Sequence, residues 1–231
     1  MKAMTDVIPP VRCSAHAHPY RLTAQAWLLL VLLPGLVLLA AGCGKPPMLI
    51  QQYMLEYPAP VVRGKTKSPE AVKVGLFSVA QAFNTNNMVF QPQPFKSETY
   101  NYSRWRANPG YLVTDYLLRD FRDSHLFTAV FAPGSNGKSR FFLEGGVEEF
   151  QEVDEPDGWK AVLALTVTLL DVSQEELPRR VVFQKQYRAV EPMPDKTPKG
   201  LAQGMSKALE HLSARIITDT YEATRQRAAR K

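Results

Sequence analysis

The sequence predicts an α+β domain, a two-layer sandwich in which two amphipathic helices pack on one face of a mostly antiparallel β-sheet. Apolar residues recur at three- and four-residue spacing in 109–124 and 198–227, as in helices with one buried face. Other segments alternate between apolar and polar residues, and the clearest pair, 141–153 and 159–172, is separated by the turn-forming residues 154–158. These two periodicities together define the fold class.

The beginnings of both helices have recognisable caps. Asn108 precedes Pro109, and Thr197 precedes Pro198, so each helix has a good N-cap residue followed by proline at its first position. Basic residues near 225–227 suit the negative end of the helix dipole. We therefore expect helices from about 109 to 124 and from about 198 to the C-terminal region.

The remaining strands are shorter. The segment 159–172 is apolar on much of both faces, which is typical of a strand that is central or covered by helices. The other segments that alternate as strands are 51–55, 72–77, 88–90, 98–102, 127–131 and 180–190.

The composition and the N-terminal region indicate an exported single domain. The chain has 231 residues, of which 45% are hydrophobic and 22% charged, which is typical of globular proteins. The uncharged apolar run 27–41 follows a segment that contains Lys2, Arg12 and Arg21, as in a secretory signal. It is short for a membrane span, which needs about 20 residues, and Pro34 lies within it. We predict that 1–42 is a signal peptide that is removed.

A cysteine follows this run directly. Ala41, Gly42 and Cys43 resemble the lipobox of bacterial lipoproteins, although Ala40 stands where leucine is usual. The resemblance implies cleavage between Gly42 and Cys43, a diacylglycerol thioether on the cysteine and an acyl group on its new amine. Several acyl chains on one residue anchor a protein stably to a membrane. The alternatives are a plain signal peptide that leaves a free thiol, or an uncleaved anchor.

The predicted cleavage also defines the rest of the chain. Cys13 would be removed, so Cys43 would have no partner for an intramolecular disulfide. Residues 43–50 would form a tether and 51–231 one periplasmic domain. The remaining basic excess is mild and scattered, which argues against a nucleic-acid partner.

No catalytic or metal-binding constellation is recognisable. His125 and His211 lack the spacing of metal ligands, and the chain contains no P-loop, G-x-S-x-G or G-x-G-x-x-G motif. We therefore expect no enzyme activity, no metal and no cofactor other than the lipid on Cys43. The acidic residues in 148–155 lie near the predicted hairpin turn, where a charge run is usually a solvated tip.

One aromatic group is a candidate partner surface. Tyr100, Tyr102 and Trp105 lie at and after the end of a predicted strand, just before the helix that begins at Pro109. Aromatic residues of this kind pack in cores, but they are also enriched at protein interfaces. Both interpretations, core packing and a docking surface, stay open from the sequence.

Several loose motifs together resemble the ABC-type transport auxiliary lipoproteins, a family that includes the paraquat-inducible type C lipoprotein. They are the lipobox, Tyr53-Met54-Leu55, Val72-x-Val74, the Tyr100-x-Tyr102-x-x-Trp105-x-x-x-Pro109 segment and Leu126-Phe127-x-x-Val130.

The resemblance implies a non-catalytic periplasmic component of an MCE-type lipid transport system. Its expected partners are an MCE-domain protein with its permease and ATPase, and a homo-oligomer would fit a tubular partner. Gly44 in place of aspartate favours delivery to the outer membrane. Docking by strand addition to an open sheet edge is physically plausible. The alternatives are a structural or assembly lipoprotein, such as a secretin pilot or a lipopolysaccharide-assembly partner, and a lipid carrier outside any ABC system.

Overall fold

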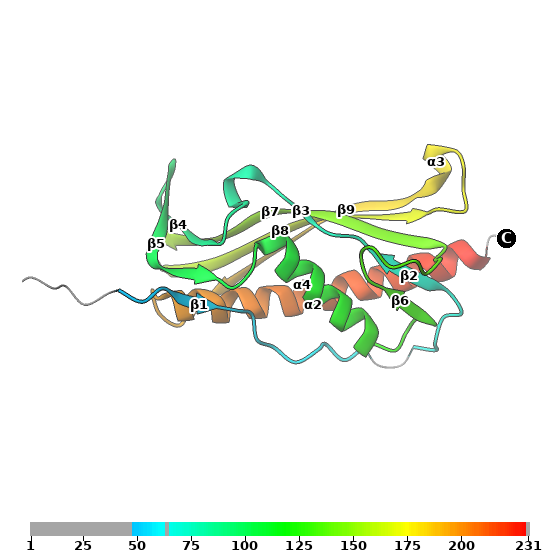
Figure 1. The fold of residues 1–231 in the computed structure, drawn as a ribbon, viewed down its shortest axis with the longest axis horizontal. Helices are drawn as coiled ribbons and strands as arrows, with labels where there is room; N and C mark the ends of the chain where they lie inside the picture. Colours follow the sequence, from blue (N-terminus) through cyan, green and yellow to red (C-terminus); the bar gives the residue numbers. More distant parts are fainter. Residues whose placement is uncertain (1–47, 63–64, 230–231) are drawn as a thin grey trace, which may run out of the picture. The chain divides into compact units, whose positions relative to one another are not determined.

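The structure is a computed structural model that describes residues 48–62 and 65–229, and residues 48–231 form one compact unit. Figure 1 shows a curled sheet with two long helices. The elements are β1 (Gln51–Tyr53), β2 (Ala71–Val74), β3 (Ser78–Val79), η1 (Gln81–Phe83), β4 (Asn87–Gln93), β5 (Lys96–Trp105), α2 (Pro109–Asp123), β6 (Ala129–Phe131), β7 (Phe141–Glu155), β8 (Gly158–Asp171), α3 (Leu177–Arg180), β9 (Val181–Pro192) and α4 (Pro198–Ala229).

The prediction of a mostly antiparallel sheet was wrong, because the sheet is mixed. The pairs β4–β5, β7–β8 and β8–β9 are antiparallel, whereas β1–β5, β2–β6, β2–β7, β3–β7 and β4–β7 are parallel. Strand β7 is the central strand of the sheet. One of its edges pairs with β8, and its other edge pairs in succession with β2, β3 and β4. A strand's periodicity does not reveal its partner, so these pairings between distant segments were not predictable from alternation.

Bulges help to curl the sheet. The register shifts between Val147 and Glu149 on β7, between Leu169 and Leu170 on β8, and twice along β4 and β5. A bulge bends the strand that carries it and increases its twist. The sheet therefore curves over the helices as a half-barrel instead of lying flat (Figure 1).

Both predicted helices are confirmed, together with their caps. The Asn108 side chain accepts a hydrogen bond of 3.0 Å from the backbone N–H of Gly110, at the start of α2. The Thr197 hydroxyl accepts one of 3.0 Å from the N–H of Gly200, at the start of α4. Each cap satisfies a donor that the first turn leaves without a helical acceptor.

The core lies between the helices and one face of the sheet. Residues 163, 165, 167 and 169 of β8 are fully buried, whereas their neighbours at 164, 166, 168 and 170 are only partly buried. The predicted coverage of this strand by helices is thus found on one face. Within the described part of the chain, no helix is both long and apolar enough to cross a bilayer.

A buried carboxylate joins the two helices. Asp120 of α2 is fully buried and accepts hydrogen bonds from the hydroxyls of Ser213 on α4, at 2.6 Å, and of Tyr57, at 2.9 Å. Arg119 forms an ion pair with the same carboxylate at 2.7 Å. Buried charges are stable in this way only when they are hydrogen-bonded and paired.

Candidate functional site

The predicted lipidation site lies outside the described residues. These begin at Met48, five positions after Cys43, and the predicted cleavage between Gly42 and Cys43 lies outside them as well. At the start of the described chain, the side chains of Met48, Leu49 and Ile50 are exposed. Lipidation of Cys43 stays a prediction.

The three predicted aromatic residues do not share one exposed surface. Trp105 is 2% exposed and packs edge-on against Phe150, with ring centroids 5.1 Å apart. Tyr102 is 47% exposed on the same strand. Tyr100 is partly buried and packs against Phe90, with ring centroids 5.0 Å apart. The core interpretation therefore fits Trp105, and Tyr102 alone of the three is available to a partner.

The sequence predicts that the acidic residues in 148–155 form a solvated tip, but this prediction does not hold for all of them. Glu152 is fully buried on β7, and its carboxylate accepts a hydrogen bond of 2.7 Å from the Tyr100 hydroxyl. Its second oxygen and one oxygen of Asp154 are both buried, and neither accepts a hydrogen bond from a described residue. Glu149 pairs with Arg188 at 2.9 Å, and Lys196 pairs with Asp154.

Burial raises the pKa of Glu152 from 4.5 to about 7, and the neighbouring carboxylate of Asp154 adds to the rise. A protonated Glu152 carries a hydroxyl donor, which a neighbouring carboxylate such as that of Asp154 can accept and which a charged Glu152 lacks. Burial also raises the pKa of Tyr100, and its hydrogen bond to Glu152 contributes. The two-residue spacing of Phe150 and Glu152 places both on one face of β7, but the bulge after Val147 decides that this face is the buried one.

The histidines and carboxylates form no evident metal centre. His211 lies on α4 with its Nδ1 atom 2.8 Å from the Glu191 carboxylate, and His125 lies in an exposed turn with a positive φ of 53°. Across residues 48–62 and 65–229, no group of three or more histidine, cysteine, aspartate and glutamate side chains is arranged to hold a metal ion.

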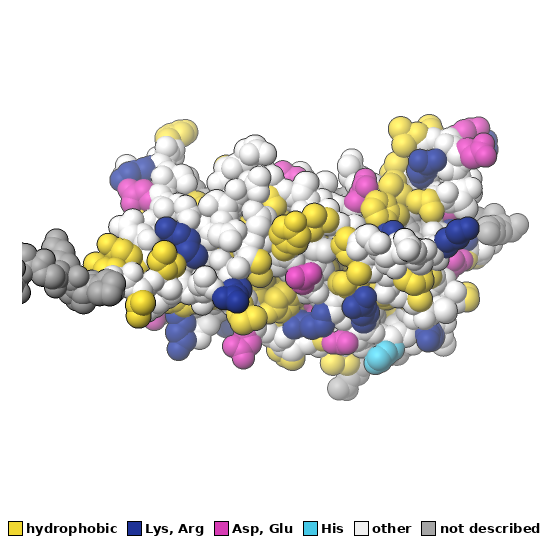
Figure 2. All heavy atoms as spheres, viewed as in Figure 1, with side chains coloured by type: hydrophobic (Ala, Val, Ile, Leu, Met, Phe, Trp, Pro, Cys, Tyr) yellow, Lys and Arg dark blue, Asp and Glu magenta, His cyan; other side chains and the backbone are white. Residues whose placement is uncertain are grey.

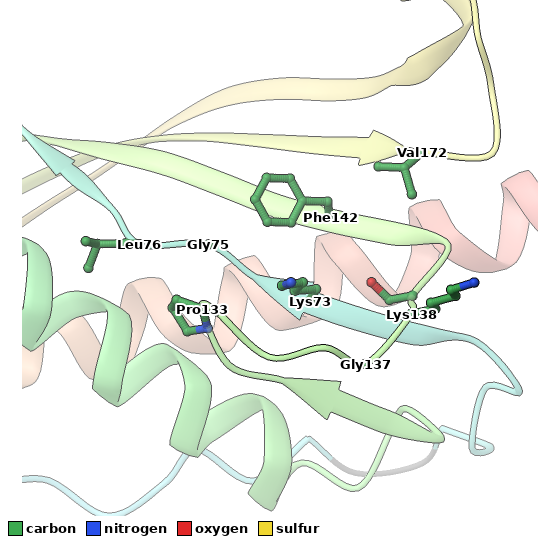
Figure 3. A pocket seen from close by; sticks show the side chains of 10 residues that line it. Lys73, Gly75, Leu76, Pro133, Gly137, Lys138, Phe142 and Val172 are labelled. Carbon is green, nitrogen blue, oxygen red and sulfur yellow. The ribbon is translucent and has the colours of Figure 1, made fainter.

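A hollow of about 610 Å³ opens on the sheet beside the loop that joins β6 to β7 (Figure 3). Pro133 and Lys138 come from this loop, Lys73 from β2, and Phe142 from β7. Lys73 lies on the face opposite the core, because its neighbours at 72 and 74 are fully buried. The sequence offers no signal for this hollow, since the loop residues 132–140 contain no recognisable motif.

A second feature is the open edge of the sheet at β9. This strand pairs only with β8, and its backbone forms no further hydrogen bonds to the described residues. Gln184, Lys185 and Gln186 are consecutive and exposed. An edge of this kind presents unpaired backbone groups to which another strand can bind.

The fold and surfaces define an α+β domain in which a curled mixed sheet covers two helices and leaves one long edge open. The family model for the ABC-type transport auxiliary lipoprotein component matches residues 53–217, and the chain belongs to this family. It is accordingly an auxiliary lipoprotein component of an ABC-type transport system.

Solved structures agree with this fold. The crystal structure of a Xanthomonas campestris protein is 18% identical, with a TM-score of 0.70, and covers 78% of this chain and 99% of its own. The crystal structure of an uncharacterized protein is 13% identical, with a TM-score of 0.57, and covers 74% of this chain and 98% of its own. Among curated proteins, none matches the sequence.

Proposed function

We propose that the chain is a non-catalytic lipoprotein, anchored by acyl groups on Cys43 to the periplasmic face of the outer membrane, that docks onto an MCE-type lipid transporter. Membership of the auxiliary lipoprotein family carries the proposal. The sequence 41–43 supports anchoring, because small residues precede a cysteine at the end of an apolar run. The glycine at position 44 supports outer-membrane delivery.

The docking surface in this proposal is the open edge of β9. The edge offers a row of backbone donors and acceptors over Val181–Pro192, and a strand of the MCE-domain protein would extend the sheet there. Lys185 and Arg188 on this strand already pair with Asp219 and Glu149 of the same chain. Specific pairing would therefore rest on the backbone more than on these charges.

Anchoring is tested by Cys43→Ser in the full chain. The expected result is an unprocessed or mislocalised precursor, whereas the wild-type protein sediments with outer-membrane vesicles and carries acyl groups that are detectable by mass spectrometry. A Cys43→Ser chain that is still acylated and found in the same membrane fraction would refute anchoring at this residue.

Docking is tested by photo-crosslinking in cells. A photoreactive amino acid at Gln186 on the β9 edge is compared with one at Glu144, which is exposed on β7. We expect an adduct with the MCE-domain protein at position 186 and none at 144. Adducts with a secretin or a lipopolysaccharide-assembly protein at 186 would instead favour the assembly-factor alternative. Absence of an adduct at 186 from an anchored protein would refute docking at this edge while leaving anchoring intact.

A further inference from the structure

The hollow beside the β6–β7 loop contains Lys73 on β2 and Phe142 on the neighbouring strand β7. Lys73 pairs in register with Phe131 on one neighbouring strand and with Phe142 on the other. Its ammonium group donates a hydrogen bond of 2.8 Å to the carbonyl oxygen of Ser135, in the loop above. In Figure 3, Phe142 and Val172 border the hollow on one side and Pro133 on the other. The ammonium group is thus positioned beside apolar side chains.

Apolar groups form much of the wall. Leu76 and Val172 line the hollow and are each 47% exposed, so their aliphatic surface is accessible to a bound hydrocarbon. Figure 2 shows hydrophobic side chains near the middle of the molecule and near α3, in the same view as Figure 1. Gly75 keeps the site open, because a Cβ there would lie 2.9 Å from the Phe142 ring.

The charge of the hollow is not balanced. Lys73 and Lys138 line it, and neither forms an ion pair with a described residue. None of its lining residues in the described chain is acidic. The nearby Arg140 contrasts with them, because it pairs with Asp171 at 2.7 Å and with Glu70 at 3.2 Å. The hollow therefore combines two uncompensated cations with an apolar wall.

We propose that this hollow binds an anionic amphiphile. A phosphate or carboxylate head group contacts the two cations that line the hollow, Lys73 and Lys138, and the adjoining hydrocarbon lies along Leu76, Phe142 and Val172. A lysine ammonium is a compact donor that suits a phosphate oxygen, and burial of hydrocarbon against aliphatic side chains adds affinity that a free anion lacks. The proposal rests on the hollow itself, and it does not depend on the β9 edge or on Cys43.

The test uses residues 43–231 with Cys43→Ser, a chain that contains the whole compact unit and no acyl group. Dodecyl phosphate, below its micelle-forming concentration, is titrated calorimetrically and compared with inorganic phosphate and with the uncharged dodecyl maltoside. We expect saturable binding of dodecyl phosphate and binding of the other two probes that is at least about tenfold weaker, since each lacks one of the two interactions. Equal affinity for inorganic phosphate or for dodecyl maltoside would overturn the proposal.

Variants locate the site. Lys73→Gln/Lys138→Gln should weaken dodecyl phosphate binding about tenfold, as expected for two partly exposed charge pairs, and leave the weak dodecyl maltoside binding unchanged. Leu76→Ser should weaken binding of both amphiphiles. The matched control, Lys67→Gln/Lys199→Gln, removes two exposed lysines elsewhere and should change neither.

Hydrogen exchange gives a second measurement on the same samples. Dodecyl phosphate should slow exchange in the peptide that covers 132–140, and the Lys73→Gln/Lys138→Gln variant should lose this protection. Full-affinity binding in that variant, or protection confined to peptides outside the hollow, would refute the assignment of this site.

Discussion

The buried carboxyl of Glu152 should make the stability of the domain depend on pH in a way that Glu152→Gln removes. Burial raises the pKa of this group from 4.5 to about 7 in the folded protein. Between these values the unfolded chain releases the proton while the folded chain keeps it. The folded state is therefore increasingly disfavoured as the pH rises through this interval, and the loss ends once the folded carboxyl has also released its proton, at about pH 8.

The size of the effect follows from the two pKa values. One pH unit over which only the unfolded state loses a proton costs about 1.4 kcal/mol. For a group that titrates at 4.5 when unfolded and about 7 when folded, the free energy of unfolding falls by about 2.5 kcal/mol between about pH 5 and about pH 8. Glutamine in place of Glu152 keeps an acceptor for the Tyr100 hydroxyl and an N–H donor for Asp154, but it does not titrate.

Urea unfolding, followed by tryptophan fluorescence, measures this difference directly. The free energy of unfolding of the Glu152→Gln variant, relative to the wild type, should rise by about 2.5 kcal/mol from about pH 5 to about pH 8. Glu148→Gln is the matched control, because Glu148 is exposed on the same strand, and its difference from the wild type should not change with pH. A Glu152→Gln difference that is equal at both pH values would refute the assignment of a proton to this buried carboxyl.

Two further predictions concern the core and the buried ion pairs. Trp105→Ala should lose about 3–5 kcal/mol in urea unfolding, because it removes a buried ring that packs on Phe150, whereas Tyr102→Ala should change stability little; similar losses would contradict the placement of the two rings. Burial raises the pKa of Asp171, but hydrogen bonds from Arg140 and Ser173 outweigh this and lower it from 3.8 to about 2. This stabilisation is present above about pH 4 and is lost as the pH falls. Relative to Asp171→Asn, the wild type should therefore lose about 1 kcal/mol between about pH 5 and about pH 3, and parallel pH profiles would contradict it.

The helices were predictable because their signals are local. The apolar stripes, the caps at Asn108 and Thr197 and the prolines that follow them all lie within one or two turns of each helix start. The β7–β8 hairpin was predictable for the same reason, since its turn joins segments that are adjacent in the sequence. A local signal of this kind requires no knowledge of the distant chain.

The sheet order was not predictable, because it depends on pairing between distant segments, and the burial of Glu152 was not predictable, because it depends on a bulge in β7. Strand β4 lies parallel to β7 through Phe90 and Glu152, residues that are far apart in the sequence. The bulge after Val147 changes which residues of β7 face the core, so that Phe141 and Val147 are buried before it and Phe150 after it. Strict alternation from Phe141 would have placed Glu152 outside.

The mixed topology also explains how one small domain offers separate surfaces. Since α2 and α4 pack on one face of the sheet, Lys73 and Phe142 lie on the other face, where the β6–β7 loop borders a hollow. Strand β8 pairs with β7, and β9 pairs with β8. Strand β9 therefore has no neighbour on its outer side among the described residues. A substitution in the hollow should therefore leave docking at β9 unaffected, and a change at β9 should leave amphiphile binding unaffected. This separation is what a transport component needs if it contacts a protein partner and an amphiphile at the same time.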